Sequence, residues 1–168
     1  MSLNACQLAI QSLINGAACP GIPTPLVAYV EPPPVVQTAD GPVAYVWGGQ
    51  GDEQRATIPR GGNSPFPGGG QKRIAHTTEI ILQWACEAGS EYEQLFPLVI
   101  DTVRSILRKA DLRIPTIDPT TGEASQMTDL GERMQWTYST PIATSPASQQ
   151  MRLNTAVLRL PFHEWIPA

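Results

Sequence analysis

The sequence has few charged residues and few of the residue types that build catalytic or metal sites. Only 15% of its 168 residues are charged, against about 25% in a typical soluble domain. The 3 cysteines, Cys6, Cys19 and Cys86, are widely spaced and form no Cys-x-x-Cys pair, which argues against a disulfide framework and a zinc site. No apolar run reaches the roughly 20 residues of a membrane helix, so we expect no membrane span.

Positive charge is absent from the first part of the chain. The net charge is −4 and no Lys or Arg precedes Arg55. The one later cluster of cations, Arg108, Lys109 and Arg113, falls near a predicted helix C-terminus, where the helix dipole favours cations. A phosphate-binding groove needs more positive charge than this, so direct nucleic-acid binding is not expected.

The 2 histidines, His76 and His163, are not placed to form a catalytic pair. A Cys–His nucleophile would need Cys86 with His76, but on one extended strand these residues stand about 33 Å apart. The Gly-rich runs at 48–51 and 68–72 lack the features that follow a nucleotide-binding loop. We therefore predict no catalytic residue, no cofactor and no metal ligand.

Hydrophobic periodicity predicts an α+β fold, a mostly antiparallel sheet with two main helices packed on one face, in the order α-β-β-β-α-β-β. Apolar spacing predicts a helix over 3–15 and a second helix behind the capping box Ser90-Glu-Tyr-Glu93, with a kink or a start at Pro97. Alternating patterns predict strands over 26–31, 43–47, 72–86, 133–140 and 151–160, the first two as a hairpin.

Proline (17 residues) and glycine (14 residues) are abundant and predict long connections. We expect one α+β domain over 1–168, with a flexible loop at 59–71, a second loop at 114–131 and a C-terminal tail at 161–168.

The N-terminal helix, the Pro-rich hairpin, the Gly-rich loop, the strand Lys72–Trp84 and the acidic-capped helix ending at Arg108 follow one another in that order. This order resembles the tail terminator (tail completion) proteins of long non-contractile-tailed bacteriophages. The resemblance implies a structural virion protein, assembled in the host cytoplasm, whose hexameric ring at the tail–neck junction caps the tail tube and stops its elongation. It also implies a tail tube protein on one face, a neck or head-completion protein on the other, and DNA passing through the lumen without specific binding.

Two other classes stay open. One is a neck or head-completion (head–tail connector) protein, which gene order would distinguish. The other is a small soluble enzyme or ligand-binding domain, which predicts a compact monomer with a pocket. The residues that we predict at subunit or partner contacts are Asp52, Glu53, Arg55, Arg60, Phe66 and Trp165.

Overall fold

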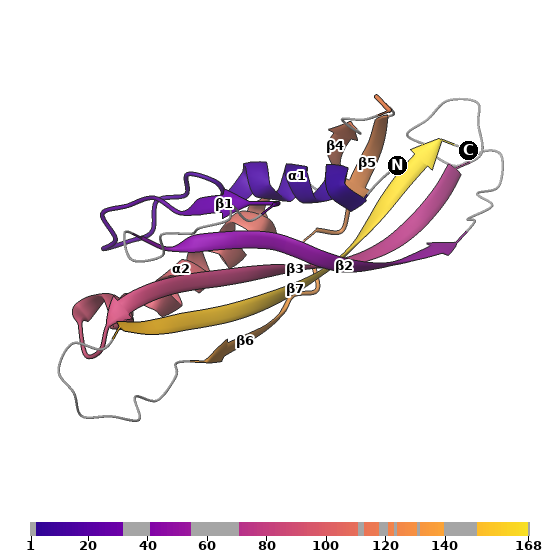
Figure 1. Cartoon of the computed structure of the whole chain (residues 1–168). Helices are drawn as coiled ribbons and strands as arrows, with labels where there is room; N and C mark the ends of the chain where they lie inside the picture. Colours follow the sequence, from indigo (N-terminus) through magenta and orange to yellow (C-terminus); the bar gives the residue numbers. More distant parts are fainter. Residues whose placement is uncertain are drawn as a thin grey trace.

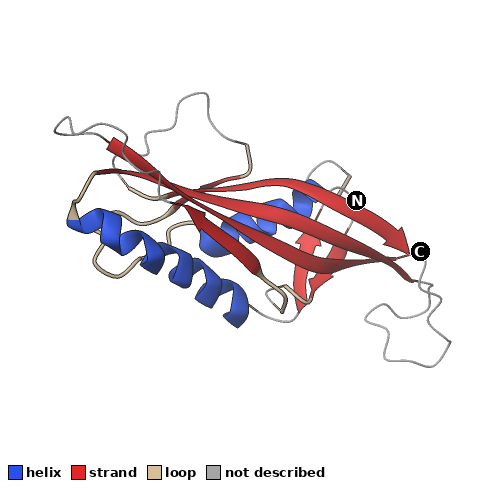
Figure 2. Cartoon of the chain, turned by 90° about the horizontal axis from the view of Figure 1, so that it is seen from below, coloured by secondary structure: helices blue, strands red, loops and turns tan. Residues whose placement is uncertain are grey.

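A computed structural model describes residues 3–31, 41–54, 71–110, 113–117, 121–122, 124–130, 132–139 and 151–167. Within these ranges the chain has two helices and a seven-stranded, mostly antiparallel sheet that curls along its length (Figures 1 and 2). The predicted α+β class is confirmed. The described strands outnumber those predicted, because two of them form within a segment expected to be a loop.

Helices α1 (Leu3–Ile14) and α2 (Glu91–Lys109) share one apolar core with the inner face of the sheet. Ile10 of α1 and Phe96 of α2 are completely buried in it. Helix α2 begins at Glu91 and continues through Pro97, so a start at Pro97 is not observed. The predicted capping box is not formed: the Ser90 side chain makes no cap hydrogen bond, and Glu93 accepts from the N–H of Gly89 at 2.8 Å and not from that of Ser90.

Strands β3 (Gln71–Glu87) and β7 (Met151–Pro167) form the centre of the sheet and pair antiparallel along their whole length. Alternate side chains of β3 from His76 to Cys86 are buried on the inner face, as the sequence pattern predicts. The prediction of a C-terminal tail at 161–168 is wrong for residues 161–167, because these residues belong to β7. Pro161 is tolerated because the pairing on one side of β7 is interrupted there, between Arg159 and His163.

The predicted loop at 114–131 is also wrong for much of its length. It contains β4 (Arg113–Ile117) and β5 (Ala124–Thr128), which pair antiparallel with each other. Strand β5 then pairs with the C-terminal end of β7, whereas β6 (Gln135–Ser139) pairs with the N-terminal part of the same strand. These strands therefore flank one side of β7 in succession (Figure 1).

The predicted hairpin near the N-terminus is wrong because β1 (Val27–Tyr29) and β2 (Val43–Gln54) run parallel. Parallel neighbours require a long return connection in place of a tight turn. Strand β2 also continues past the glycines expected to end it, with a shift of register between Trp47 and Gln50. The predicted loop at 59–71 lies outside the described residues except for its last position, which begins β3.

Candidate functional site

The residues predicted at subunit contacts are only partly placed by the structure. Asp52 and Glu53 lie on β2 after its register shift, opposite Ala75 and Ile74 of β3. We call this end of the sheet, where β2 ends, β3 begins and β7 ends, its distal part. Arg55, Arg60 and Phe66 lie outside the described residues. The contact predicted for these side chains therefore stays a prediction.

Trp165 lies on β7 in the middle of the sheet, so its predicted place on a free tail is wrong. It is opposite Arg73 on one neighbouring strand and Gln126 on the other. Its ring N–H donates to Oγ1 of Thr128 at 3.1 Å, and the Arg73 guanidinium lies 5.8 Å from its ring centroid. The half-buried indole is thus held by contacts within the chain, and the partner contact predicted for it stays a prediction.

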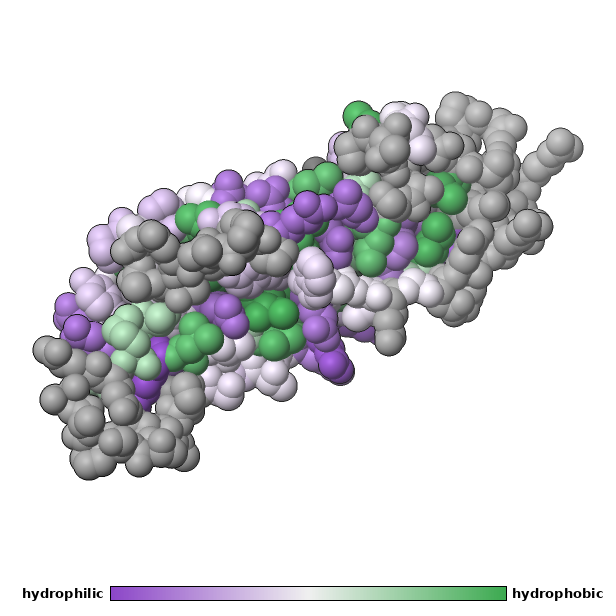
Figure 3. All heavy atoms as spheres, viewed as in Figure 1, coloured by the Kyte–Doolittle hydropathy of each residue, from purple (hydrophilic) through white to green (hydrophobic). Residues whose placement is uncertain are grey.

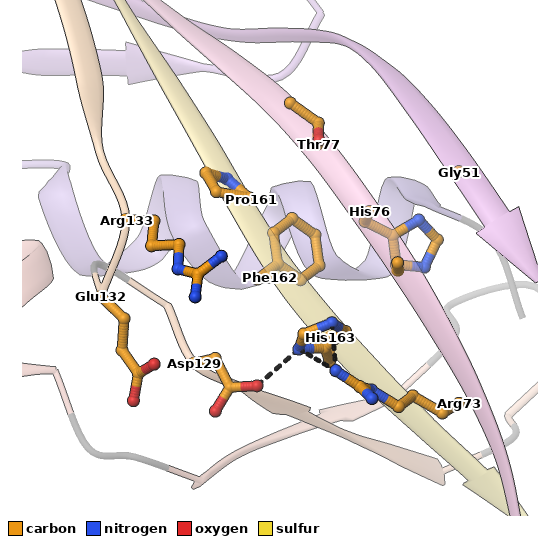
Figure 4. A pocket seen from close by; sticks show the side chains of 11 residues that line it. Gly51, Arg73, His76, Thr77, Asp129, Glu132, Arg133, Pro161, Phe162 and His163 are labelled. Carbon is orange, nitrogen blue, oxygen red and sulfur yellow. Dashed lines mark hydrogen bonds and ion pairs between the residues drawn. The ribbon is translucent and has the colours of Figure 1, made fainter. Parts of the chain in front are cut away.

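A charged hollow of about 650 Å³ lies beside Trp165, between the distal parts of β2, β3 and β7 and the segment that follows β5 (Figure 4). His163 is at its centre. Nδ1 of His163 lies 2.5 Å from Oδ2 of Asp129, and Nη2 of Arg73 lies 2.6 Å from Nε2 of His163. Because a guanidinium only donates, Nε2 accepts and Nδ1–H donates to the carboxylate. Both ring nitrogens of His163 are thus engaged, and neither is free to transfer a proton to a ligand.

A buried chain of polar side chains lies next to this hollow. Glu164 is completely buried and His76 is 7% exposed. Nε2 of His76 lies 2.8 Å from Oε2 of Glu164, and the Ser125 hydroxyl donates to Oε1 of Glu164 at 2.8 Å. Ser125 is also hydrogen-bonded to Thr116. The Glu164 carboxylate on β7 therefore contacts side chains of β3 and β5 directly. It is linked to Thr116 on β4 through Ser125.

This chain of residues is arranged for structure and not for nucleophilic catalysis. A serine nucleophile needs its hydroxyl against a base that can accept the proton, usually an imidazole. Here the Ser125 hydroxyl is directed at a carboxylate, on the opposite side of Glu164 from His76. Sequence reasoning missed this pair because it ended the last strand at residue 160. The alternation of Leu158, Leu160 and Phe162 continues to Glu164, which was the available signal.

The cysteine thiols are buried and unpaired by disulfides. Burial raises the pKa of Cys6 to about 12, with a further increase from the nearby Glu164 charge. Burial likewise raises the pKa of Cys86 to about 11 and raises that of Cys19. The thiolate is the reactive form, so these side chains have packing roles near neutral pH.

Within the described ranges, no group of three or more His, Cys, Asp or Glu side chains is arranged to hold a metal ion. The same ranges contain no helix that is both long and apolar enough to span a membrane.

Several large apolar side chains are exposed on the outer face of the sheet. Both helices lie on the opposite face, and on this face Trp47 is 52% exposed, Met151 51%, Leu153 41% and Val27 40%. Figure 3 shows hydrophobic side chains along the middle of β3 and β7 on the side facing the viewer. Large exposed apolar patches on soluble proteins usually mark contacts with other molecules.

Comparison of the sequence with protein-family models and with curated proteins finds no match.

Proposed function

We propose that the protein is a structural subunit of a phage virion, a tail terminator that forms a ring at the end of the tail tube. The ring stops tube elongation and joins the tail to the head through a neck or head-completion protein. The observation that carries the proposal is the outer face of the sheet, where several large apolar side chains are exposed on the face opposite the helices.

Association with another molecule buries the exposed apolar side chains of such a face. Full burial of one side chain the size of leucine or methionine contributes about 1.5–3 kcal/mol. The four large apolar residues on this face are 40–52% exposed, so a partner that covers them gains about half of this energy from each. A subunit of a ring that also meets a tube and a neck protein has partners available for more than one of its surfaces.

The charge distribution supports the same proposal. A ring that lets DNA slide through its lumen needs few cations there, because each Lys or Arg against a phosphate adds affinity. The chain has no Lys or Arg before Arg55, so both α1 and the described part of β2 are free of positive side chains. Arg73, His163 and Asp129 of the charged hollow are held by one another, which fits a structural subunit better than an enzyme.

The direct test is native mass spectrometry of the purified protein, followed by an assay of tail tube length. We expect a closed ring near six times 18.2 kDa, and tubes that stop growing when the ring is added to polymerising tube subunits. A protein that stays monomeric and leaves tube length unchanged would contradict the proposal. A ring that binds portal or neck proteins but not tube ends would favour the head-completion alternative.

A matched pair of leucine variants tests the role of the outer face. Leu153 is 41% exposed on that face, whereas Leu8 is 36% exposed on α1. We expect Leu153→Asp to weaken ring formation or binding to the tube at least tenfold, and Leu8→Asp to have little effect. Equal effects of the two substitutions would show that the outer face has no special role.

A further inference from the structure

The two edges of the sheet differ in how their backbone groups are satisfied. At the β1 edge, the Ala28 N–H donates to Oδ1 of Asn15 at 3.0 Å, and the Ala28 carbonyl accepts from Nε2 of Gln11 at 3.0 Å. Both groups point away from β2, so the side chains of Gln11 on α1 and of Asn15 just after it close this edge. An edge closed in this way cannot accept another strand.

Strand β6 forms a different kind of edge. All five of its residues, Gln135–Ser139, are exposed, and none carries a charge or is a proline. It pairs with β7 on one side, and none of the described strands pairs with its other side. Natural sheets protect exposed edges with charges, prolines or bulges, none of which β6 has. It is therefore suited to accept an additional strand.

The inner face of β6 is packed against side chains of α2. Trp136 lies under the Arg104 guanidinium, 3.6 Å from the ring centroid, and the Tyr138 ring lies 5.4 Å from that of Phe96 on α2. The strand is held in an extended conformation before any partner arrives. Pre-organisation of this kind reduces the entropy lost on binding.

Guanidinium groups surround the start of β6 and retain donors for a carboxylate. A guanidinium has five N–H donors. Arg104 uses Nη1 on Asp101, and Arg159, 64% exposed and opposite Gln135, uses Nε on Glu79. Arg133, just before β6, is exposed and lines the charged hollow, and it forms no ion pair among the described residues.

The distal part of β2 has the complementary charge. Strand β1 pairs with β2 only from Val43 to Tyr45, so along Gln50–Gln54 only the β3 side of β2 has a partner among the described strands. This segment contains Asp52 and Glu53 and no cation. It lies at the opposite edge of the sheet from β6.

We propose that β6 is a docking edge for a second copy of this chain, which adds its acidic β2 segment, Gln50–Gln54, to the sheet. The inference rests on the proposed ring function, because it names the contact that joins neighbouring subunits. Two different edges meet in this contact, so it is heterologous. Repeated from copy to copy, a heterologous contact closes into a ring when the rotation permits.

Charge reversal at both edges tests the inference. The first variant, Arg133→Glu/Thr137→Glu, removes the cation just before β6 and places an acid on the strand itself. The second, Asp52→Lys/Glu53→Lys, places cations on β2. Each variant alone sets like charges against each other and is expected to raise the dissociation constant of association at least tenfold. An equimolar mixture restores opposite charges at every contact, so we expect it to assemble like the unaltered protein in sedimentation and native mass spectrometry.

Control variants carry the same changes of charge at exposed positions away from both edges. Arg108→Glu/Ala88→Glu matches the first variant, and Glu87→Lys/Glu91→Lys matches the second. Both controls are expected to assemble normally. Circular dichroism and thermal unfolding establish that all four variants are folded, so that a loss of assembly reports on the contact.

Three outcomes would overturn the inference. The first is a wild-type chain that stays monomeric up to about 1 mM, although such a chain can still cap tails by assembling on the tube, which leaves the proposed function intact. The second is ring formation unaffected by either reversal, which again leaves the proposed function intact. The third is loss of assembly that the mixture does not restore, which would show that the two edges are not partners.

Discussion

Nε2 of His76 lies 2.8 Å from Oε2 of Glu164, although the two residues stand 88 positions apart in the chain. The full-length antiparallel register of β3 and β7 brings them together, since Ile74 is opposite Glu164 and His76 is opposite Phe162. The carboxylate is completely buried. A buried polar group is tolerated only while its hydrogen-bond partners are in place. This contact therefore couples the stability of the distal sheet to correct pairing of the two longest strands.

Replacement of Glu164 is expected to destabilise the protein strongly. Glu164→Ala leaves both His76 and Ser125 buried without their shared partner, which costs about 3–5 kcal/mol of unfolding free energy. Glu164→Gln keeps one acceptor and is expected to cost about 1–3 kcal/mol. Urea denaturation measures both values. The exposed Glu132 provides the control, since Glu132→Ala is expected to change stability by about 0.5 kcal/mol or less. A Glu164→Ala variant as stable as this control would show that the buried contact contributes nothing.

Two leucines on β7 separate the inner from the outer face of the sheet. Leu158 is completely buried and Leu153 is 41% exposed. Leu158→Ala creates a cavity in the core and is expected to cost about 2–5 kcal/mol, whereas Leu153→Ala is expected to cost about 0.5 kcal/mol or less in the isolated subunit. Chemical denaturation of both variants gives the comparison. Similar losses at the two positions would contradict the assignment of faces.

The cysteines are expected to resist alkylation in the folded protein. Burial raises the pKa of Cys6 to about 12 and that of Cys86 to about 11, so the thiolate fraction at pH 8 is very small. Iodoacetamide should leave the folded chain unmodified and should modify it fully in urea, as measured by mass spectrometry. A Leu8→Cys variant supplies an exposed thiol that reacts under both conditions. Rapid modification of Cys6 or Cys86 in the folded chain would show that the core opens.

The same pKa increases predict how stability depends on pH. The ordinary thiol pKa is 9.0, and the folded-state values of Cys6 and Cys86 are higher. The unfolded chain therefore loses its thiol protons before the folded chain does, and unfolding is favoured as the pH rises above about 9. Cys6→Ala/Cys86→Ala should remove part of this slope between pH 9 and 11, after correction for the stability lost with the side chains. An unchanged slope would assign the alkaline destabilisation to other groups.

The closed β1 edge predicts a local effect of Asn15. Asn15→Ala removes the acceptor for the Ala28 N–H, a buried position, and is expected to cost about 1–3 kcal/mol. Hydrogen exchange should show faster exchange of the Ala28 amide. Asn4→Ala, at an exposed position on α1, should leave both stability and exchange nearly unchanged. Unaltered protection of Ala28 in the Asn15 variant would mean that another group closes this edge.

The sequence was sufficient to predict the elements whose two faces differ in polarity. Strand β3 alternates between buried residues such as Leu82 and half-exposed ones such as Gln83, and helix α2 has a buried stripe that includes Phe96 and Val103. Strands β4 and β5 carry no such local signal, since one contains Pro115 and the other has the polar sequence Ala-Ser-Gln-Met-Thr. They are strands because β5 pairs with β7, a partner distant in the chain. Local pattern does not contain that information.

The candidate site was predictable only in part for the same reason. Asp52 and Glu53 were expected beyond the end of the strand at 43–47, whereas they lie on β2, which continues to Gln54. The contacts of His163 with Asp129 and Arg73 join three segments that are far apart in the sequence. Likewise, β6 is an edge strand because β5 pairs only with the C-terminal end of β7 and does not extend alongside β6. The composition of β6 does not predict this. Each of these features depends on strand register, which no single segment specifies.

The central position of β7 also bears on how the chain is made. Strand β3 lies between β2 and β7, and β7 is the last strand in sequence order. During translation, β3 leaves the ribosome long before the strand that completes its hydrogen bonds. Until then the edge of β3 that pairs with β7 has no partner strand. Nascent chains with such an unpaired edge are prone to associate wrongly or to recruit chaperones. Completion of the sheet is therefore delayed until β7 has emerged.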